Sequence, residues 1–590
     1  MHNLSLAVLK HAYQSGQTTP RTLLLDLHQQ AQTHSDKNIF ITLLSETDLL
    51  HYIEAIEAQD PASLPLYGVP FAIKDNLDLA NFPTTAACPA FAYTAKTSAH
   101  TVQLLINAGA IPLGKTNLDQ FATGLNGTRS PYGQVPNAFL PEYISGGSSS
   151  GSAVATALGL VSFALGTDTA GSGRVPAALN NLVGVKPSKG LLSNVGLVPA
   201  CRSLDCVSIF ALNCDDAAYL FDLLAQYDPQ DPYARPNPHG NRHRYFPSHP
   251  ATFAFGLPQL ELNPEAQTLF KQATDHLIAL GGTPVPIDFS PFLSAARLLY
   301  QGPWISERKL ATQAVASSDM LSVIQDIIVN TPEPTASQAF EGLYKLTELK
   351  RQCDAILAQV DLIITPAFPR AFIRAEIDAD PIATNSSLGT YTNFMNLLDY
   401  AALALPAGTH TNGLPYGITL FGPAFSDMYL LSIGREFHLR TGLPQGATAH
   451  PLPNQPIACA KAPSEHTDVL VCGAHLAGEP LNWQLLERGA SLKATTHTAS
   501  GYRLYTLPDD KRPALVRDPS SQSQIAVEIW RVPTATLGSF LTGIAAPLGL
   551  GQVQIEDGSW VTGFICEPIA LDGARDISEF GGWRAWKASL

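Results

Sequence analysis

The first three quarters of the chain alternate between two patterns of apolar and polar positions. In residues 215–227, 263–282 and 343–359, apolar side chains recur three and four positions apart, which is the spacing of one face of an α-helix. Residues 64–80 instead hold a short apolar run bounded by Pro and Gly, as expected of a buried strand. Residues 100–119 join a helical pattern, a Gly turn and a strand. This alternation predicts an α/β fold with a mixed sheet.

A capping pair and an apolar run predict the positions of two further helices. Thr19 followed by Pro20 is typical of a helix N-cap and the first helical residue. Residues 153–166, AVATALGLVSFALG, are largely apolar and too short to cross a bilayer, which takes about 20 residues. We therefore expect a helix from Pro20 and a buried helix over 153–166.

A change of composition divides the chain near its last quarter. Residues 446–465 are rich in Pro, Ala and Gly without periodicity, which predicts an interdomain linker. Residues 466–590 hold short β-rich segments separated by turn residues, and predict a small, mainly-β α+β domain. Residues 1–445 then form the larger domain, with helices at its N-terminus.

Composition and charge narrow the class of partner. The 590 residues are 45% hydrophobic and 15% charged, which is enough for a large core. The formal net charge is −14 and the Lys and Arg residues are scattered, so neither nucleic acid nor an anionic membrane surface is an expected partner. A small-molecule substrate is the expectation that remains.

The cysteine spacing, the cofactor motifs that are absent and the N-terminal segment each argue against one kind of site or signal. None of the eight Cys residues lies at C-x-x-C spacing, which argues against a zinc site or a disulfide framework. The sequence has no Walker loop, dinucleotide-binding fingerprint or biotin site, so we expect neither a cofactor nor a metal. The first 30 residues lack the basic segment and apolar core of a signal peptide, and a cytoplasmic location is the expectation.

The Ser/Gly run SGGSSSGS, residues 145–152, allows three interpretations. Composition alone favours a flexible linker. The run leads directly into an apolar segment and a second Gly-rich loop, however, which favours a pocket of hydroxyls and backbone N–H groups suited to acyl transfer. GSSSG also matches G-x-S-x-G, the nucleophile elbow of α/β-hydrolases, with Ser149 at its centre. That alternative needs a later His, and three candidates lie in a segment that we expect to be an exposed loop: His239, His243 and His249.

Two longer segments resemble the amidase signature family. They are residues 146–190, which contain both Gly/Ser loops, and YGVPFAIKDN at residues 67–76. The resemblance implies a mixed central sheet covered by helices on both faces. It also implies Ser172 as nucleophile, Ser148 as bridging serine and Lys74 as general base, with a cis peptide bond before Ser148. A Lys among apolar neighbours has a lowered pKa, so its neutral amine can accept the proton that Ser148 relays from Ser172.

The same resemblance implies an oxyanion hole. Its donors are the backbone N–H groups of Thr169, Ala170, Gly171 and Ser172, which would stabilise the tetrahedral intermediate.

Within this family, residues 81–91, residues 115–133 and the C-terminal region resemble the allophanate hydrolases. This resemblance implies hydrolysis of allophanate, H2N-CO-NH-COO⁻, to ammonia and carbon dioxide in urea degradation. It implies Tyr300, Arg308 and Gly124 as substrate-binding residues. A guanidinium can hold the carboxylate of allophanate through two hydrogen bonds and so aim its carbamoyl carbon at the nucleophile.

The C-terminal segment resembles the γ-glutamyl-cyclotransferase-like domain of those enzymes. The resemblance implies a role in decarboxylating N-carboxycarbamate, with His475 and Glu528 as acid/base candidates. A structural role for His475 stays open, because the intermediate also loses carbon dioxide unaided.

The family resemblance further implies a homodimer and a functional link to a separate biotin-dependent urea carboxylase. Three alternatives remain: another amidase of the amidase signature family; the glutaminyl-tRNA type of amidotransferase, whose amidase component would not need the C-terminal domain; and a catalytically silent scaffold. The scaffold is expected to have lost Lys74, Ser148 or Ser172, and all three are present.

Overall fold

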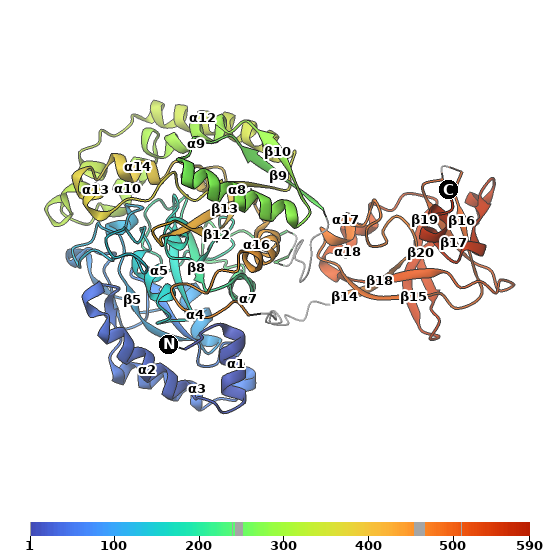
Figure 1. The fold of residues 1–590 in the computed structure, drawn as a ribbon, viewed down its shortest axis with the longest axis horizontal. Helices are drawn as coiled ribbons and strands as arrows, with labels where there is room; N and C mark the ends of the chain where they lie inside the picture. The colour runs from blue at the N-terminus through green and yellow to red at the C-terminus, as the bar shows by residue number, and fades with distance from the viewer. Residues whose placement is uncertain (1, 239, 242–251, 454–465, 509) are drawn as a thin grey trace. The chain divides into compact units, whose positions relative to one another are not determined.

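The computed structural model describes residues 2–238, 240–241, 252–453, 466–508 and 510–590 (Figure 1). The chain divides into two compact units, Met1–Asn237 with Ser248–Ala460, and Lys461–Leu590 with Pro238–Pro247. Of the predicted linker, residues 454–465 lie outside the described residues. Its described part belongs to the first unit, because Gly446 O accepts a hydrogen bond from Asn181 and Ala447 N–H donates to Ala157 O.

The first unit is built on an 11-stranded mixed sheet among its described residues. β2 pairs in parallel with both β5 and β6, whereas the centre of the sheet is antiparallel. In spatial order the strands are β1 (Phe40–Leu43), β5 (Ile111–Thr116), β2 (Pro70–Lys74), β6 (Phe163–Asp168), β8 (Cys206–Ala211), β7 (Val183–Lys186), β12 (Tyr400–Thr409), β13 (Pro415–Pro423), β11 (Leu362–Pro366), β9 (Phe253–Pro258) and β10 (Gly282–Ile287).

Every residue of β2, β5, β6, β7, β8 and β11 is buried. Because successive side chains of a strand point to opposite faces, both faces of the sheet are covered there. The cover includes α5 (Ser150–Ala157) against β6 and α16 (Asp427–Thr441) against β12. The predicted α/β fold with a mixed sheet and helices on both faces is confirmed.

Most local predictions are also confirmed. Helix α2 (Pro20–Thr33) begins after Thr19, whose Oγ1 accepts a hydrogen bond from Thr22 N–H at 3.2 Å. The remaining helices of this unit are α1 (Leu6–Gln14), α3 (Glu46–Glu57), α4 (His100–Asn107), α6 (Val175–Leu179), α7 (Cys214–Leu224), α8 (Pro264–Ala279), α9 (Ser290–Gln301), α10 (Trp304–Thr312), α11 (Ser322–Ile324), α12 (Ala336–Leu357), α13 (Arg374–Ala379), α14 (Ala383–Leu388) and α15 (Phe394–Leu397).

The single buried helix expected over 153–166 is wrong. Helix α5 ends at Ala157, Gly159 adopts φ +66°, and the chain continues as strand β6 from Phe163. A fully buried strand carries the same continuous apolar run as a buried helix, so periodicity cannot separate them.

The second unit contains a five-stranded sheet and a three-stranded sheet in its described residues. The first has the order β15 (Ser491–His497), β18 (Ala526–Pro533), β14 (His466–Val471), β20 (Trp560–Cys566) and β19 (Leu548–Gln554). The second has the order β17 (Pro513–Arg517), β16 (Tyr502–Thr506) and β21 (Arg575–Asp576), and the helices are α17 (Trp483–Leu486), α18 (Thr534–Leu541) and α19 (Trp583–Lys587). Their apolar faces enclose a core around Val469, Trp530 and Trp586, as expected of a small, mainly-β α+β domain.

In the part of the chain that the structure describes, no helix is both long enough and apolar enough to span a membrane.

Candidate active site

Lys74, Ser148 and Ser172 meet in the interior of the first unit. Lys74 is the last residue of β2 and Ser172 follows β6, and because these strands are parallel neighbours their carboxyl ends lie at one edge of the sheet. Ser148 Oγ lies 2.8 Å from Lys74 Nζ and 2.9 Å from Ser172 Oγ. All three residues are buried, at 0%, 0% and 2% exposure for Lys74, Ser148 and Ser172. The three side chains form one continuous path for a proton.

The amine of Lys74 has hydroxyl groups as its hydrogen-bonding partners and no ion pair. Besides Ser148, its Nζ contacts Thr167 Oγ1 at 2.7 Å, and no carboxylate of the described residues lies within 4.0 Å of it. Burial lowers the pKa of Lys74 to about 7, although the more distant Asp119, Asp205 and Asp168 act in the opposite direction. Lys74 can therefore be a neutral base near pH 7.

The Ser/Gly run is a buried part of this site, so the flexible-linker interpretation is wrong. All residues of 145–152 are buried, and the Gly147–Ser148 peptide bond is cis, as the resemblance implied. A Cβ atom at Gly147 would lie 2.1 Å from Asp119 Oδ2, so this position requires glycine. Asp119 fixes the loop further, because its N–H donates to Ser148 O at 3.1 Å and its carboxylate accepts from Gly127 N–H.

Ser149 points away from the Lys74 path. Its Oγ donates to Thr167 O at 3.1 Å and accepts from Thr167 N–H at 3.3 Å. These contacts anchor the start of α5 to strand β6 and favour a structural role over the nucleophile elbow. The histidines that the elbow needed, His239, His243 and His249, lie outside the described residues.

The loop after β6 is shaped by the carboxylate of Asp168. It accepts hydrogen bonds from Gly171 N–H and Gly173 N–H, both at 2.9 Å, and forms an ion pair with Arg174 at 2.9 Å. Burial alone would raise the pKa of Asp168, but Arg174 holds it below its ordinary value. A buried carboxylate in this position fixes the turn that presents Ser172.

This contact changes the expected set of oxyanion donors. Gly171 N–H already has Asp168 as its acceptor. Among the described residues, no acceptor is bonded to the N–H groups of Thr169, Ala170 or Ser172. The Thr169 hydroxyl donates to Asp205 at 2.5 Å, which holds the backbone of the loop in place. The loop therefore offers three unoccupied N–H donors beside Ser172.

Tyr300, Arg308 and the segment around Gly124 converge beside the same loop. Tyr300 packs in one apolar cluster with Ala170. The guanidinium of Arg308 lies 5.7 Å from the centre of the Tyr300 ring and donates to Thr123 Oγ1 at 2.9 Å. A Cβ at Gly124 would lie 2.4 Å from Asp119 Oδ2, which explains the glycine. Arg308 has a buried side chain and no carboxylate partner among the described residues.

The sequence analysis did not predict four residues of this site: Asp119, Thr167, Asp205 and Arg129. Asp119 bonds to Ser148, Thr167 to Lys74, Asp205 to Thr169, and Arg129 to Thr123 O at 2.9 Å. The first three of these hydrogen bonds join segments that are distant along the chain, which leaves no spacing signal in the sequence.

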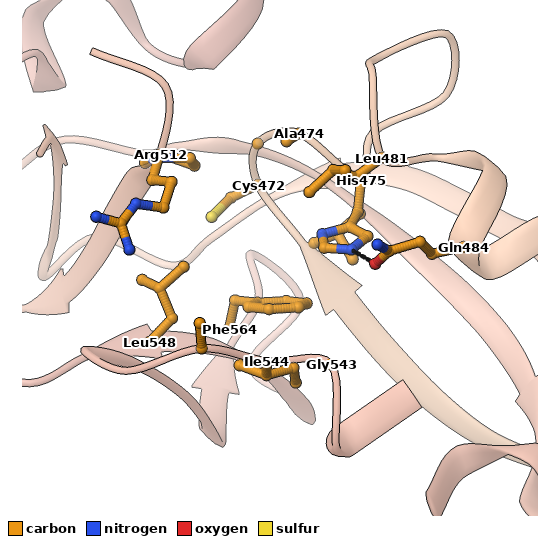
Figure 2. A pocket seen from close by; sticks show the side chains of 14 residues that line it. Cys472, Ala474, His475, Leu481, Gln484, Arg512, Gly543, Ile544, Leu548 and Phe564 are labelled. Atoms are coloured by element: carbon orange, nitrogen blue, oxygen red, sulfur yellow. Dashed lines mark hydrogen bonds between the residues drawn. The ribbon is translucent and has the colours of Figure 1, made fainter. Parts of the chain in front are cut away.

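In the second unit, His475 lines a cavity of about 130 Å³ together with Cys472, Arg512 and Phe564 (Figure 2). Its Nε2 lies 3.0 Å from Gln484 Oε1, and its ring is stacked on Phe564 with centroids 5.1 Å apart. Burial lowers the pKa of His475, which favours its neutral form. A mostly apolar cavity with a few polar side chains, here His475, Gln484 and Arg512, suits a small polar ligand.

Glu528 does not line this cavity. Its carboxylate accepts hydrogen bonds from Ala477 N–H at 2.7 Å, Trp530 Nε1 at 3.0 Å and Arg584 at 2.9 Å. With three donors around it, Glu528 braces the segment that follows His475.

Family models match both units. One described as Amidase covers residues 22–431, and one described as Allophanate hydrolase C-terminal domain covers residues 467–588. Among curated proteins, urea amidolyase of Saccharomyces cerevisiae is 42% identical over a stretch covering 98% of this chain and 32% of that protein. The chain thus spans about a third of the length of the urea amidolyases it matches.

Solved structures agree with these matches. Allophanate hydrolase of Kluyveromyces lactis superposes with a TM-score of 0.85 at 38% identity, covering 98% of both chains. Urea amidolyase of the same organism superposes with a TM-score of 0.84 at 38% identity, covering 98% of this chain and 36% of that one. Together with the geometry of Lys74, Ser148 and Ser172, these matches show that the chain belongs to the amidase signature family.

Proposed function

We propose that this chain hydrolyses allophanate to ammonia and carbon dioxide in the degradation of urea. The observation that carries the proposal is the Lys74–Ser148–Ser172 path lying beside Arg308, a buried guanidinium without a carboxylate partner among the described residues. The likeness to Kluyveromyces lactis allophanate hydrolase over both units supports the substrate.

The first step forms an acyl-enzyme. Ser172 Oγ attacks the carbamoyl carbon of allophanate, while its proton passes to Ser148 and the Ser148 proton passes to neutral Lys74. The N–H groups of Thr169, Ala170 and Ser172 stabilise the oxyanion, and each such donor lowers the barrier by about 3 kcal/mol in a comparable site. Return of the proton from Lys74 releases ammonia. Water then attacks the acyl-enzyme by the same relay and frees N-carboxycarbamate.

The substrate carboxylate is held by Arg308, with Tyr300 beneath the guanidinium. Gly124 follows Thr123, whose hydroxyl accepts from Arg308, and its lack of a side chain lets this segment pack against Asp119. The glutaminyl-tRNA type of amidotransferase shares the Ser-Ser-Lys core, but the match to an allophanate hydrolase C-terminal domain over residues 467–588 favours allophanate.

The cavity of the second unit takes N-carboxycarbamate in this proposal. When carbon dioxide leaves N-carboxycarbamate, the nitrogen takes up a proton to give carbamate, and His475, neutral and on the cavity wall, would relay that proton from water. Carbamate then takes up a proton and breaks down to ammonia and a second carbon dioxide. Its hydrogen bond to Gln484 fixes the orientation of the ring.

Allophanate arises by carboxylation of urea, and the proposal assigns that step to a biotin-dependent urea carboxylase. Relatives named urea amidolyase are about three times as long as this chain, which supports a link between the two reactions. The homodimer and the cytoplasmic location stay predictions from sequence.

The serine assignment is tested by ammonia release from freshly prepared allophanate. Ser172→Ala is expected to lower kcat/KM by about a thousandfold or more, because it removes the nucleophile. Ser149→Ala, which changes the neighbouring serine run without touching the relay, is expected to stay within about tenfold of the unmodified protein. Loss of activity in Ser149→Ala alone would contradict the relay, and no ammonia from the unmodified protein would contradict the substrate.

The pH dependence follows from Lys74. Its base form is neutral, and its pKa is about 7, so kcat/KM is expected to fall about tenfold per pH unit below pH 7 and to level off above it. An ordinary lysine would make the rate rise until about pH 10. A stopped assay of ammonia between pH 6 and 10 separates the two cases.

The role of the second unit is tested with His475→Ala against His497→Ala, a matched control at an exposed histidine. We expect His475→Ala to release the first ammonia at a rate within about twofold of the unmodified protein, while N-carboxycarbamate accumulates in ¹³C NMR spectra. Equal rates of carbon dioxide release in both variants would show that the cavity does not catalyse decarboxylation.

A further inference from the structure

Two buried arginines of the first unit have no carboxylate in contact among the described residues. Arg129, Arg174 and Arg308 are the buried arginines among the described residues, with exposed fractions of 3%, 0% and 2%. Arg174 forms an ion pair with Asp168 at 2.9 Å. For Arg129 and Arg308, no described carboxylate lies within 4.0 Å, and the Nε atom of each is buried without a hydrogen-bond partner.

The two unpaired guanidinium groups converge on one residue, Thr123. Arg129 Nη1 donates to Thr123 O at 2.9 Å, and Arg308 Nη1 donates to Thr123 Oγ1 at 2.9 Å. Arg129 is fixed at its other end by Pro381 O. Burial lowers the pKa of Arg129 and the charge of Arg308 adds to that effect, while Asp119 opposes it. The two charges therefore act on each other across a single residue.

Such an arrangement is costly unless an anion completes it. Two like charges removed from water repel each other and lose their hydration. Asp119 acts on Arg129, and Asp205 and Glu307 act on Arg308, from beyond contact distance, so a negative group that binds beside the two guanidinium groups gains attraction from both. The terminal N–H groups of Arg129 have carbonyl acceptors, whereas no hydrogen bond is made by Arg308 Nη2 with any described residue. Arg308 can therefore donate a hydrogen bond to a ligand. Arg129, bonded to the backbone of Thr123, attracts an anionic ligand through its charge without touching it.

We propose that Arg129 is a specificity-determining residue that makes the site selective for substrates with a carboxylate. This inference rests on the proposed function, since it concerns the substrate of that site. A carboxylate bound to Arg308 is stabilised by both positive charges. A neutral amide in the same place gains no charge attraction from either arginine, so discrimination against it exceeds what Arg308 alone provides.

The test compares allophanate with biuret, in which a neutral amide replaces the carboxylate. Arg129→Gln removes the charge and keeps a hydrogen-bond donor, Arg129→Lys keeps the charge, and Arg308→Gln is measured in parallel. Arg297→Gln removes an exposed charge from α9 as the matched control. Circular dichroism and thermal unfolding confirm that each variant is folded, and binding of malonate, a small dicarboxylate, is measured by calorimetry.

For Arg129→Gln we expect kcat/KM for allophanate to fall about tenfold or more, mainly through KM, with biuret turnover within about twofold. Malonate affinity should fall in parallel, and Arg129→Lys should regain most of both losses. Arg297→Gln should behave as the unmodified protein.

Equal losses on allophanate and biuret, or no rescue by Arg129→Lys, would overturn the inference and leave Arg129 as a brace for Thr123 and Pro381. If the unmodified protein releases no ammonia from allophanate, the proposed function fails instead. The malonate measurement then still decides whether Arg129 contributes to anion binding.

Discussion

The site depends on the burial of Lys74 without a carboxylate in contact. Lys115, on the neighbouring strand β5, is equally buried but lies 2.9 Å from Asp75, which makes it an ion pair. Lys74 meets hydroxyl groups in place of a carboxylate. Its pKa falls to about 7 because the lost hydration of the ammonium outweighs the attraction of the more distant carboxylates. Lys115 therefore has a structural ion pair, whereas Lys74, on the adjacent strand and without a carboxylate in contact, can act as a base.

Buried carboxylates act around Lys74 as anchors for backbone. Asp119 holds the loop that carries Ser148 by donating its backbone N–H to Ser148 O, while its carboxylate accepts backbone N–H groups of the segment 127–129. Asp168 shapes the loop that carries Ser172 by accepting two of that loop's own N–H groups. Neither carboxylate is in contact with Lys74, and although both favour the protonated amine, burial outweighs them and lowers the Lys74 pKa. The parallel pairing of β2 with β6 then brings the two loops to one edge of the sheet. The hydrogen bonds of Asp119 and Asp168 thus hold the two serine loops where the sheet places them beside Lys74.

The α/β fold could be predicted from the alternation of helical and strand patterns. Lys74, Ser148 and Ser172 could be predicted together because they lie in segments that resemble a family's motifs, and the spacing within such motifs reflects local geometry. Prediction from the sequence failed where an outcome depends on contacts between distant segments. Residues 153–166 divide into helix and strand because of burial on both sides, and Glu528 turned out to be bonded to Arg584, far along the chain. Arg129 carried no signal in the sequence, since its importance comes from sharing Thr123 with Arg308.

The protonation of Lys74 is the most direct test of this account. The protein can be labelled with ¹³C at the lysine side chains, and the Lys74 signal assigned as the one absent from Lys74→Met. If Lys74 is the base of the relay, its signal titrates near pH 7, apart from those of exposed lysines. A Lys74 signal that remains that of an ammonium up to about pH 10, the ordinary range of lysine, would contradict the proposed relay.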